Sequence, residues 1–336
     1  MKRFLTLIAV LLYFGTAFGQ QDPMFTKYMF NSLVFNPAYA GSKDHMSLGI
    51  LHRSQWVGID GAPVTQSVTI HTPLKNERVG VGFSLVNDKI GPTNNLGANL
   101  SYAYRIPMGE NGGKLSIGLQ AGVENYRGDF NQLQTEAGAG ADIAFIDNPN
   151  QWLPNFGAGI YYYNKSFYAG VSSPHIVEYD LSQNSLGTDG RQIWARQYRH
   201  YFFTAGGAIP LSGEDLVFKP SFLIKNVGLL GNLRKEPEFR TITTPTEFDI
   251  DLSVFFYQTL WIGLSYRSAF EAFDKSSSFD SFDIWASYFL KNGLRIGAAY
   301  DYTLTELSQA TSGSFELFLG YEFEYETKKT VTPRYF

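Results

Sequence analysis

The C-terminal run 246–326 alternates apolar residues with polar or small ones, and this period of two constrains the fold more than any other feature. Successive side chains of a β-strand point to opposite faces, so each stretch forms a ribbon with one apolar face. Segments of about ten residues suit a soluble sheet and also a strand that crosses a bilayer. The apolar series are Phe248, Ile250, Leu252, Val254 and Phe256; Leu294, Ile296, Ala298, Tyr300 and Tyr302; and Phe315, Leu317, Leu319, Tyr321, Phe323 and Tyr325.

The composition favours the membrane alternative. Charged residues make up 17% of the 336 residues, aromatic residues make up 16%, and there are 33 glycines. An average soluble chain has about 25% charged residues. The lipid-facing side of a barrel needs no charge, which accounts for the deficit. The net charge of −4 gives no indication of a nucleic-acid partner, and the absence of cysteine excludes disulfides and cysteine-bound metal.

Residues 1–19 are predicted to be a secretory signal peptide. Lys2 and Arg3 precede an apolar core at 5–14, and small residues flank an expected cleavage point after Gly19. The alternative is a short membrane anchor, although the core is well below the ~20 residues of a spanning helix. No later stretch reaches ~18 apolar residues, so the exported chain is expected to be either soluble or a barrel.

Fourteen strands are predicted, and an even number would return both ends of a barrel to the same side of the membrane. Connections of even rank are short, and those of odd rank are mostly longer. Outer-membrane barrels show this alternation, whereas β-sandwiches do not. The predicted strands are 46–56, 65–71, 78–87, 94–107, 114–125, 154–163, 166–172, 197–209, 215–226, 246–257, 259–268, 280–290, 293–303 and 312–326. The predicted long connections are 57–64, 88–93, 126–153, 173–196, 227–245, 269–279 and 304–311.

Charged residues occur on the polar face of these strands, which a soluble core could not bury without partners. The fold class predicted is therefore an all-β transmembrane antiparallel barrel with a polar lumen. The candidate lumen-facing charges are Arg105, Glu124, Asp249, Asp251, Arg267 and Arg295, with Lys219, Lys225, Glu316 and Glu322 in the same phase. Trp56, Trp261 and Trp285 near strand ends suit the aromatic girdles at the membrane surfaces, or else ordinary packing.

Two terminal segments flank the predicted barrel, 45–326. Segment 20–44 contains Pro23 and Pro37 among several aromatic residues and is too apolar for a solvated linker. It is expected either to fill the lumen or to pack against the periplasmic rim. The tail 327–336 is expected to lie in the periplasm and contact a partner, because Pro333 interrupts an extension of the last strand. The alternative is that Phe336 is a terminal aromatic signal for barrel insertion.

No motif indicates an enzyme, a cofactor or a metal site. The five histidines lack metal-ligand spacing, and no GxSxG segment occurs. Glu247, Asp249 and Asp251 place three carboxylates on one face, which suits a salt-bridged lumen better than a cation site. Glycine at alternate strand positions, as at Gly80 and Gly82, is interpreted as close packing inside the lumen. A barrel hydrolase with scattered catalytic residues remains the third hypothesis.

The sequence around the start of the expected mature chain resembles the PorP/SprF family. The similarity continues through Asn155–Tyr162, Ala169–His175, Leu260–Arg267 and Pro333–Phe336, and it covers essentially all of 20–336. The motif positions at the start are Asp22, Pro23, Tyr28, Asn36, Pro37, Ala38, Tyr39, Gly41, Arg53, Gln55, Trp56 and Pro63.

This resemblance implies a fourteen-stranded, multi-pass barrel of the bacterial outer membrane, with a partly filled lumen, in the type IX secretion system of Bacteroidota. It implies a role in the export and surface attachment of large proteins, including gliding adhesins with a C-terminal secretion domain. The implied partners are outer-membrane lipid, the secreted surface protein, and periplasmic ring or peptidoglycan-linked secretion components. The alternative function is an outer-membrane channel for small solutes.

Overall fold

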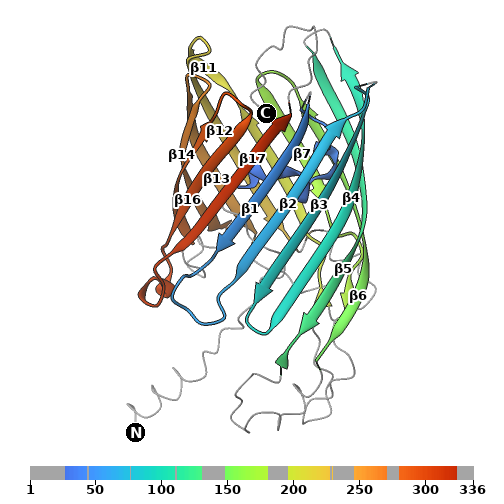
Figure 1. The fold of residues 1–336 in the computed structure, drawn as a ribbon, viewed down its shortest axis with the longest axis vertical. Helices are drawn as coiled ribbons and strands as arrows, with labels where there is room; N and C mark the ends of the chain where they lie inside the picture. Colours follow the sequence, from blue (N-terminus) through green and yellow to red (C-terminus); the bar gives the residue numbers. More distant parts are fainter. Residues whose placement is uncertain are drawn as a thin grey trace.

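A computed structural model gives a closed antiparallel β-barrel of fourteen strands with a short segment inside its lumen (Figure 1). It describes residues 27–43, 45–75, 77–109, 112–130, 148–180, 196–227, 229, 246–270 and 280–323. Among these residues, no helix is long and apolar enough to cross a membrane. The predicted signal peptide and the C-terminal tail lie outside the described residues.

The strands follow one another around the barrel in sequence order. The wall consists of β1 (Met46–Ser54), β2 (Val64–Pro73), β3 (Val79–Ile90), β4 (Thr93–Met108), β5 (Gly113–Gly128), β6 (Asn150–Tyr163), β7 (Phe167–Ser173), β10 (Tyr201–Gly207), β12 (Leu216–Asn226), β13 (Glu247–Phe256), β14 (Leu260–Ala269), β15 (Ser281–Phe289), β16 (Leu294–Thr303) and β17 (Ser314–Phe323). Pairing of β1 with β17, from Met46 opposite Phe323 to Ser54 opposite Phe315, closes the barrel. Every predicted strand is present, so the fold-class prediction is confirmed.

Smaller elements accompany these fourteen strands. The short strand β11 (Ile209–Ser212) continues the line of β10 and pairs with β12. The strands β8 (Tyr179–Asp180) and β9 (Arg196–Gln197) form a separate two-stranded ribbon, and the 3-10 helix η8 (Glu306–Gln309) lies between β16 and β17.

The outer face of the wall is apolar and the inner face is polar, as the alternation predicts. On β13, Leu252 is 52% exposed, whereas the adjacent Ser253 is 1% exposed. Leu100 on β4 and Leu317 on β17 are likewise well exposed, at 66% and 59%. Water-soluble monomers rarely present such a continuous apolar surface, but it matches the hydrocarbon of a bilayer.

The turns divide the barrel into two ends. The end where β1 begins and β17 finishes carries tight turns and is called the short-turn end, at the top of Figure 1; the opposite end is called the long-loop end. One connection departs from the prediction. The segment 88–93 is not a long loop, because β3 continues to Ile90 and β4 begins at Thr93, leaving only Gly91 and Pro92 in the turn. Gly91 has a φ of +54°, which suits such a tight reversal.

Residues 27–43 lie inside the barrel and are called the plug. The plug contains the 3-10 helix η1 (Tyr28–Phe30), the one-turn helix α2 (Ser32–Phe35) and the 3-10 helix η2 (Pro37–Tyr39). Helix η2 contacts β4, β5 and β6, and α2 contacts β2 and β3. The plug is visible as the blue helical segment behind the front strands in Figure 1.

Candidate functional site: the plugged lumen

The plug turn 36–41 sits against glycines of the barrel wall. A Cβ atom at Gly118 on β5 would lie under 3.0 Å from the backbone of Ala38, and one at Gly80 on β3 would lie under 3.0 Å from the backbone of Ala40. A Cβ atom does not approach a non-bonded atom this closely, so a side chain at either position would force the plug away from the wall. Close backbone approach therefore explains the inward-facing glycines.

Hydrogen bonds fix the same turn. The Ser116 hydroxyl donates to the Ala38 carbonyl at 2.6 Å, and the Ser172 hydroxyl donates to the Phe35 carbonyl at 2.8 Å. The Asn36 amide donates to the Ile160 carbonyl at 3.1 Å. Buried backbone groups need such partners, so the wall supplies what a short, irregular segment cannot satisfy by itself.

The motif residues of the plug occupy defined positions in this turn. The Asn36 side chain caps η2 by accepting from the Ala38 amide at 2.9 Å, and Pro37 begins the helix. The ring of Tyr39 lies edge-on to those of His71 and Tyr161, at centroid distances of 5.2 and 5.5 Å.

Three further hydrogen bonds join the plug to the wall. The Arg105 guanidinium donates to the Gly41 carbonyl. The Tyr28 hydroxyl donates to Ser221, and the Asn31 amide donates to Ser67.

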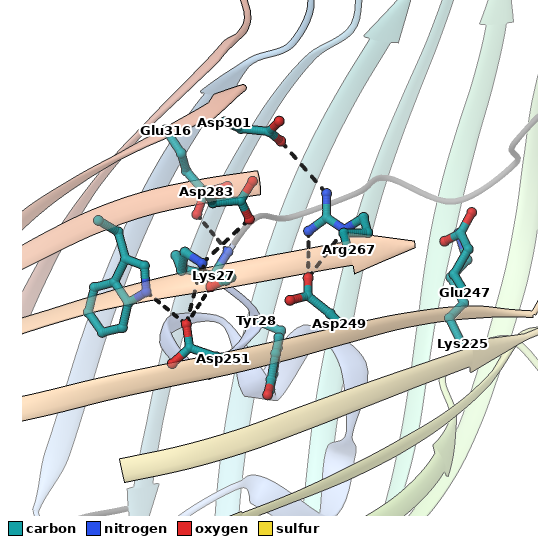
Figure 2. A network of polar contacts seen from close by, with 12 residues as sticks. Lys27, Tyr28, Lys225, Glu247, Asp249, Asp251, Arg267, Asp283, Asp301 and Glu316 are labelled. Carbon is teal, nitrogen blue, oxygen red and sulfur yellow. Dashed lines mark hydrogen bonds and ion pairs between the residues drawn. The ribbon is translucent and has the colours of Figure 1, made fainter. Parts of the chain in front are cut away.

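At its other end the plug enters a buried network of charges (Figure 2). The Lys27 ammonium lies 3.5 Å from an Asp251 carboxylate oxygen and 3.6 Å from one of Asp283, and it also contacts the Ser265 hydroxyl. The Lys27 backbone amide donates to Glu316 at 3.1 Å. All three acids and Lys27 are almost fully buried. Charges buried at this depth are stable only when paired, so Lys27 links the plug to three strands.

Two arginines of the wall continue the network. Arg267 lies 2.7 Å from Asp249 and 3.8 Å from Asp301, and Arg53 lies 2.9 Å from Asp301 and 3.7 Å from Glu316. These pairs join β13, β14, β16, β17 and β1 around the lumen. The motif residue Arg53 therefore connects two acids of the charge network, Asp301 and Glu316.

The acidic triplet predicted on β13 is salt-bridged. Glu247 lies 3.6 Å from Lys225, Asp249 pairs with Arg267, and Asp251 pairs with Lys27. Across the described residues, no group of three or more His, Cys, Asp or Glu side chains could hold a metal ion.

The half of the lumen toward the short-turn end has a different lining and contains a cavity of about 310 Å³. Aromatic rings form much of its wall, and the plug residue Phe30 closes its inner end against Trp261 and Trp285, at ring-centroid distances of 5.1 and 5.4 Å. The Lys219 ammonium lies 3.6 Å from the Trp261 ring centroid. The Arg295 guanidinium lies 4.6 Å from that of Phe30.

Of the two alternatives for Trp261 and Trp285, a membrane girdle or ordinary packing, the structure shows packing. Both point into the lumen and are buried, at 8% and 2% exposure. The strand period explains this position, because Trp261 is an even number of residues from the inward-facing Arg267 on β14. Trp285 has the same relation to Asp283 on β15.

The remaining predicted positions that the structure describes lie near the long-loop end of the barrel. Glu124 lies 3.0 Å from His175 and accepts from Gln197 at 2.8 Å, which holds the start of the 173–196 loop and β9 against the long-loop mouth. Gln55 donates its backbone amide to the Pro63 carbonyl across the β1–β2 loop at 2.9 Å. Trp56 is in that loop with a φ of +48°. Asp22 and Pro23 lie outside the described residues.

Lys27, Asp283 and Asp301 belong to the network but were not singled out from the sequence. Asp283 and Asp301 could have been found, since each is in phase with the inward side of its strand. Lys27 had no comparable signal, because the plug has no strand period.

The family profile described as type IX secretion system membrane protein PorP/SprF matches residues 17–321 of this chain. Among solved structures, the CymD monoaromatic hydrocarbon channel is similar, with 12% identity, a TM-score of 0.53, and coverage of 92% of this chain and 96% of that one. The Ralstonia pickettii toluene transporter TbuX shows 13% identity and a TM-score of 0.48, covering 92% and 96%. The Acinetobacter baumannii protein Omp33 shows 10% identity and a TM-score of 0.41, covering 83% and 99%. A search of curated protein sequences found no match. At these identities the structural similarity shows the fold alone.

Proposed function

Since this chain belongs to the PorP/SprF family of type IX secretion system membrane proteins, we propose that it is a non-enzymatic accessory that assists the export and surface attachment of a partner protein, such as an adhesin. The chain is a multi-pass protein of the outer membrane and a component of that secretion system. What we propose beyond family membership is that the chain binds a partner protein and assists its export and surface attachment.

The filled lumen is the observation that carries the proposal. The plug is held by buried ion pairs at Lys27 and by the glycine-lined seat at Gly80 and Gly118. The cavity beside it, about 310 Å³, is far smaller than a folded domain. A partner protein would therefore bind to the barrel rather than pass through it.

The proposed docking surfaces are the long loops 126–153, 173–196 and 227–245, which lie mostly outside the described residues. Loops of this length usually have functions of their own. The proposed partners on the opposite side are periplasmic ring or peptidoglycan-linked secretion components, and the tail 327–336 is the segment proposed to contact them.

Affinity isolation tests the partner role. A tagged chain, extracted from outer membranes of the native organism in mild detergent, is expected to retain a secreted surface protein with a C-terminal secretion domain. A variant lacking the 227–245 loop, with the barrel still inserted, is expected to lose that protein. Equal recovery with both chains, or recovery of no secreted protein, contradicts the proposal.

An epitope tag inserted in 227–245 tests the orientation. Short turns face the periplasm in outer-membrane barrels, so antibody is expected to reach the tag on intact cells. A tag placed in the β13–β14 turn at Tyr257 should be reached only after the outer membrane is opened. Labelling in the reverse order would overturn the assigned topology.

The second candidate is a channel for small solutes, because the lumen keeps a cavity beside the plug. Planar-bilayer conductance separates the two functions. A plugged accessory is expected to show little steady conductance, whereas a large steady conductance from the unmodified chain favours the channel.

A further inference from the structure

The cavity of the short-turn half is built from plug, wall and rim. Its inner end is closed by the plug residues Phe30 and Leu33, and Gln258 in the β13–β14 turn belongs to its lining. The cavity therefore reaches the short-turn rim, whereas its other end is blocked by the plug. This shape fits a bound group better than a solute in transit.

The charge of the cavity is positive. Its lining contains three Lys or Arg side chains, two histidines and a single carboxylate, which are Lys43, Lys219, Arg295, His45, His71 and Glu322. Glu322 is occupied by its neighbours: one of its oxygens contacts the Lys43 ammonium, and the other lies 3.2 Å from the His45 ring nitrogen.

Arg295 lies over aromatic rings and forms no direct ion pair among the described residues, although the Glu322 carboxylate is close enough to attract it. Its guanidinium carbon lies 4.6 Å from the ring centroid of Phe30 and 5.6 Å from that of Phe289. Across the strand pair, Gly320 leaves room for it, since a Cβ there would lie 2.9 Å from a guanidinium nitrogen. No carboxylate among the described residues forms an ion pair with Arg295, and its buried Nε has no hydrogen-bond partner in that part of the chain.

From these observations we propose that the cavity binds an apolar carboxylate, an acid group attached to an aromatic or aliphatic body, which enters from the short-turn end. Arg295 pairs with the carboxylate, a geometry that guanidinium groups favour. The rings of Trp261, Phe255 and Phe289 receive the apolar body. At about 310 Å³, the cavity lies at the lower end of the range for small-ligand sites.

Two kinds of ligand carry an apolar body with a carboxylate: a free organic acid and the C-terminal residue of a peptide. The proposal concerns the cavity itself and holds whether or not the secretion role is correct.

Calorimetric titration of the full purified chain in non-ionic detergent tests the site. The probe is N-acetyl-L-phenylalanine, and the charge-free control is its amide. The acid is expected to bind, and the amide is expected to bind about tenfold more weakly or not at all. Absence of binding by the acid, or equal affinities for acid and amide, would overturn the proposal.

Variants locate the site. Arg295→Gln is expected to weaken binding of the acid about tenfold, and Lys219→Met is a second variant that alters the same cavity without touching Arg295. Lys225→Met is the matched control, because Lys225 is on the same strand as Lys219 but pairs with Glu247 at the long-loop end. The proposed site is contradicted if the control loses as much affinity for the acid as the cavity variants do, or if neither cavity variant loses affinity.

A short peptide with a C-terminal phenylalanine distinguishes the sources. Tighter binding than that of the single residue indicates that a chain terminus occupies the cavity, since the rim would contact the preceding residues. Weaker binding indicates a free organic acid. The site is supported in either case, provided that Arg295→Gln reduces the affinity.

Discussion

The two halves of the lumen are lined by the same strands but held together by different interactions. In the long-loop half, Lys27, Arg53 and Arg267 pair with five buried acids, Asp249, Asp251, Asp283, Asp301 and Glu316. In the short-turn half, Lys219 and Arg295 lie over aromatic rings, and a cavity remains. The charge network of the first half anchors the start of the plug at Lys27, whereas the second half holds the turn 36–41 against glycines of the wall and leaves a cavity beside it.

The contrast occurs within single strands. On β13, Asp249 and Asp251 face the charged half, whereas Ser253 faces the aromatic half. On β14, Arg267 faces the charged half and Trp261 the aromatic half. A strand can therefore provide an anchor at one end and a pocket at the other without any change in its backbone.

Removal of the central cation should produce the largest effect. Lys27→Met leaves Asp251 and Asp283 buried without their ammonium partner, and the expected loss is about 3–5 kcal/mol of unfolding free energy. Urea unfolding in lipid vesicles measures it. In the double variant Lys27→Met/Asp283→Asn, much of the lost unfolding free energy should be recovered, because one uncompensated buried charge is removed. Wild-type stability of the single variant would mean that the network does not anchor the plug.

A side chain in the glycine seat should have the next largest effect. Gly118→Ala places a Cβ atom against the backbone of Ala38, and the expected cost is about 1–3 kcal/mol. Displacement of the plug should also raise single-channel conductance in planar bilayers. Gly207→Ala is the matched control, because its Cβ would approach no atom closer than 3.6 Å. If conductance rose in the control but not in Gly118→Ala, the plug would not be held by close packing against Gly118.

Tyr28 lies at the boundary between the halves and tests a neutral contact. Its hydroxyl donates to Ser221 at 2.8 Å, and burial raises its pKa well above the usual value, so it remains a protonated donor. Tyr28→Phe should cost about 0.5–1.5 kcal/mol in the same unfolding assay. Adding Ser221→Ala should give a total loss below the sum of the two single losses, because the two side chains share a hydrogen bond. Fully additive losses would show that the bond contributes nothing.

The smallest effect is expected at the short-turn rim. Lys43 and Glu322 form an ion pair that is partly exposed, at 17% and 32% of their side chains. Lys43→Met should cost less than about 1 kcal/mol, and raising the salt concentration should reduce the difference further. A loss as large as that of Lys27→Met would remove the distinction between the two halves.

Much of the barrel and part of its lining follow from the sequence. The inward positions of Asp249, Asp251 and Arg267 are consequences of the strand period, and so is the outward position of Leu252. Consistent use of that period would also have placed Trp261 inside. The turn at Gly91 was missed because polar residues interrupt the apolar alternation before β3 ends.

The sequence by itself therefore determined the closed barrel, its apolar outer face and the charges inside it. It could do so because alternation is a local property of each strand. Only the tertiary structure decided which acid each base meets, where residues 27–43 lie, and that a cavity remains at one end. Those features depend on contacts such as Lys27 with Asp251 or Gly118 with Ala38. Such contacts join residues far apart in the chain, and no local period encodes them.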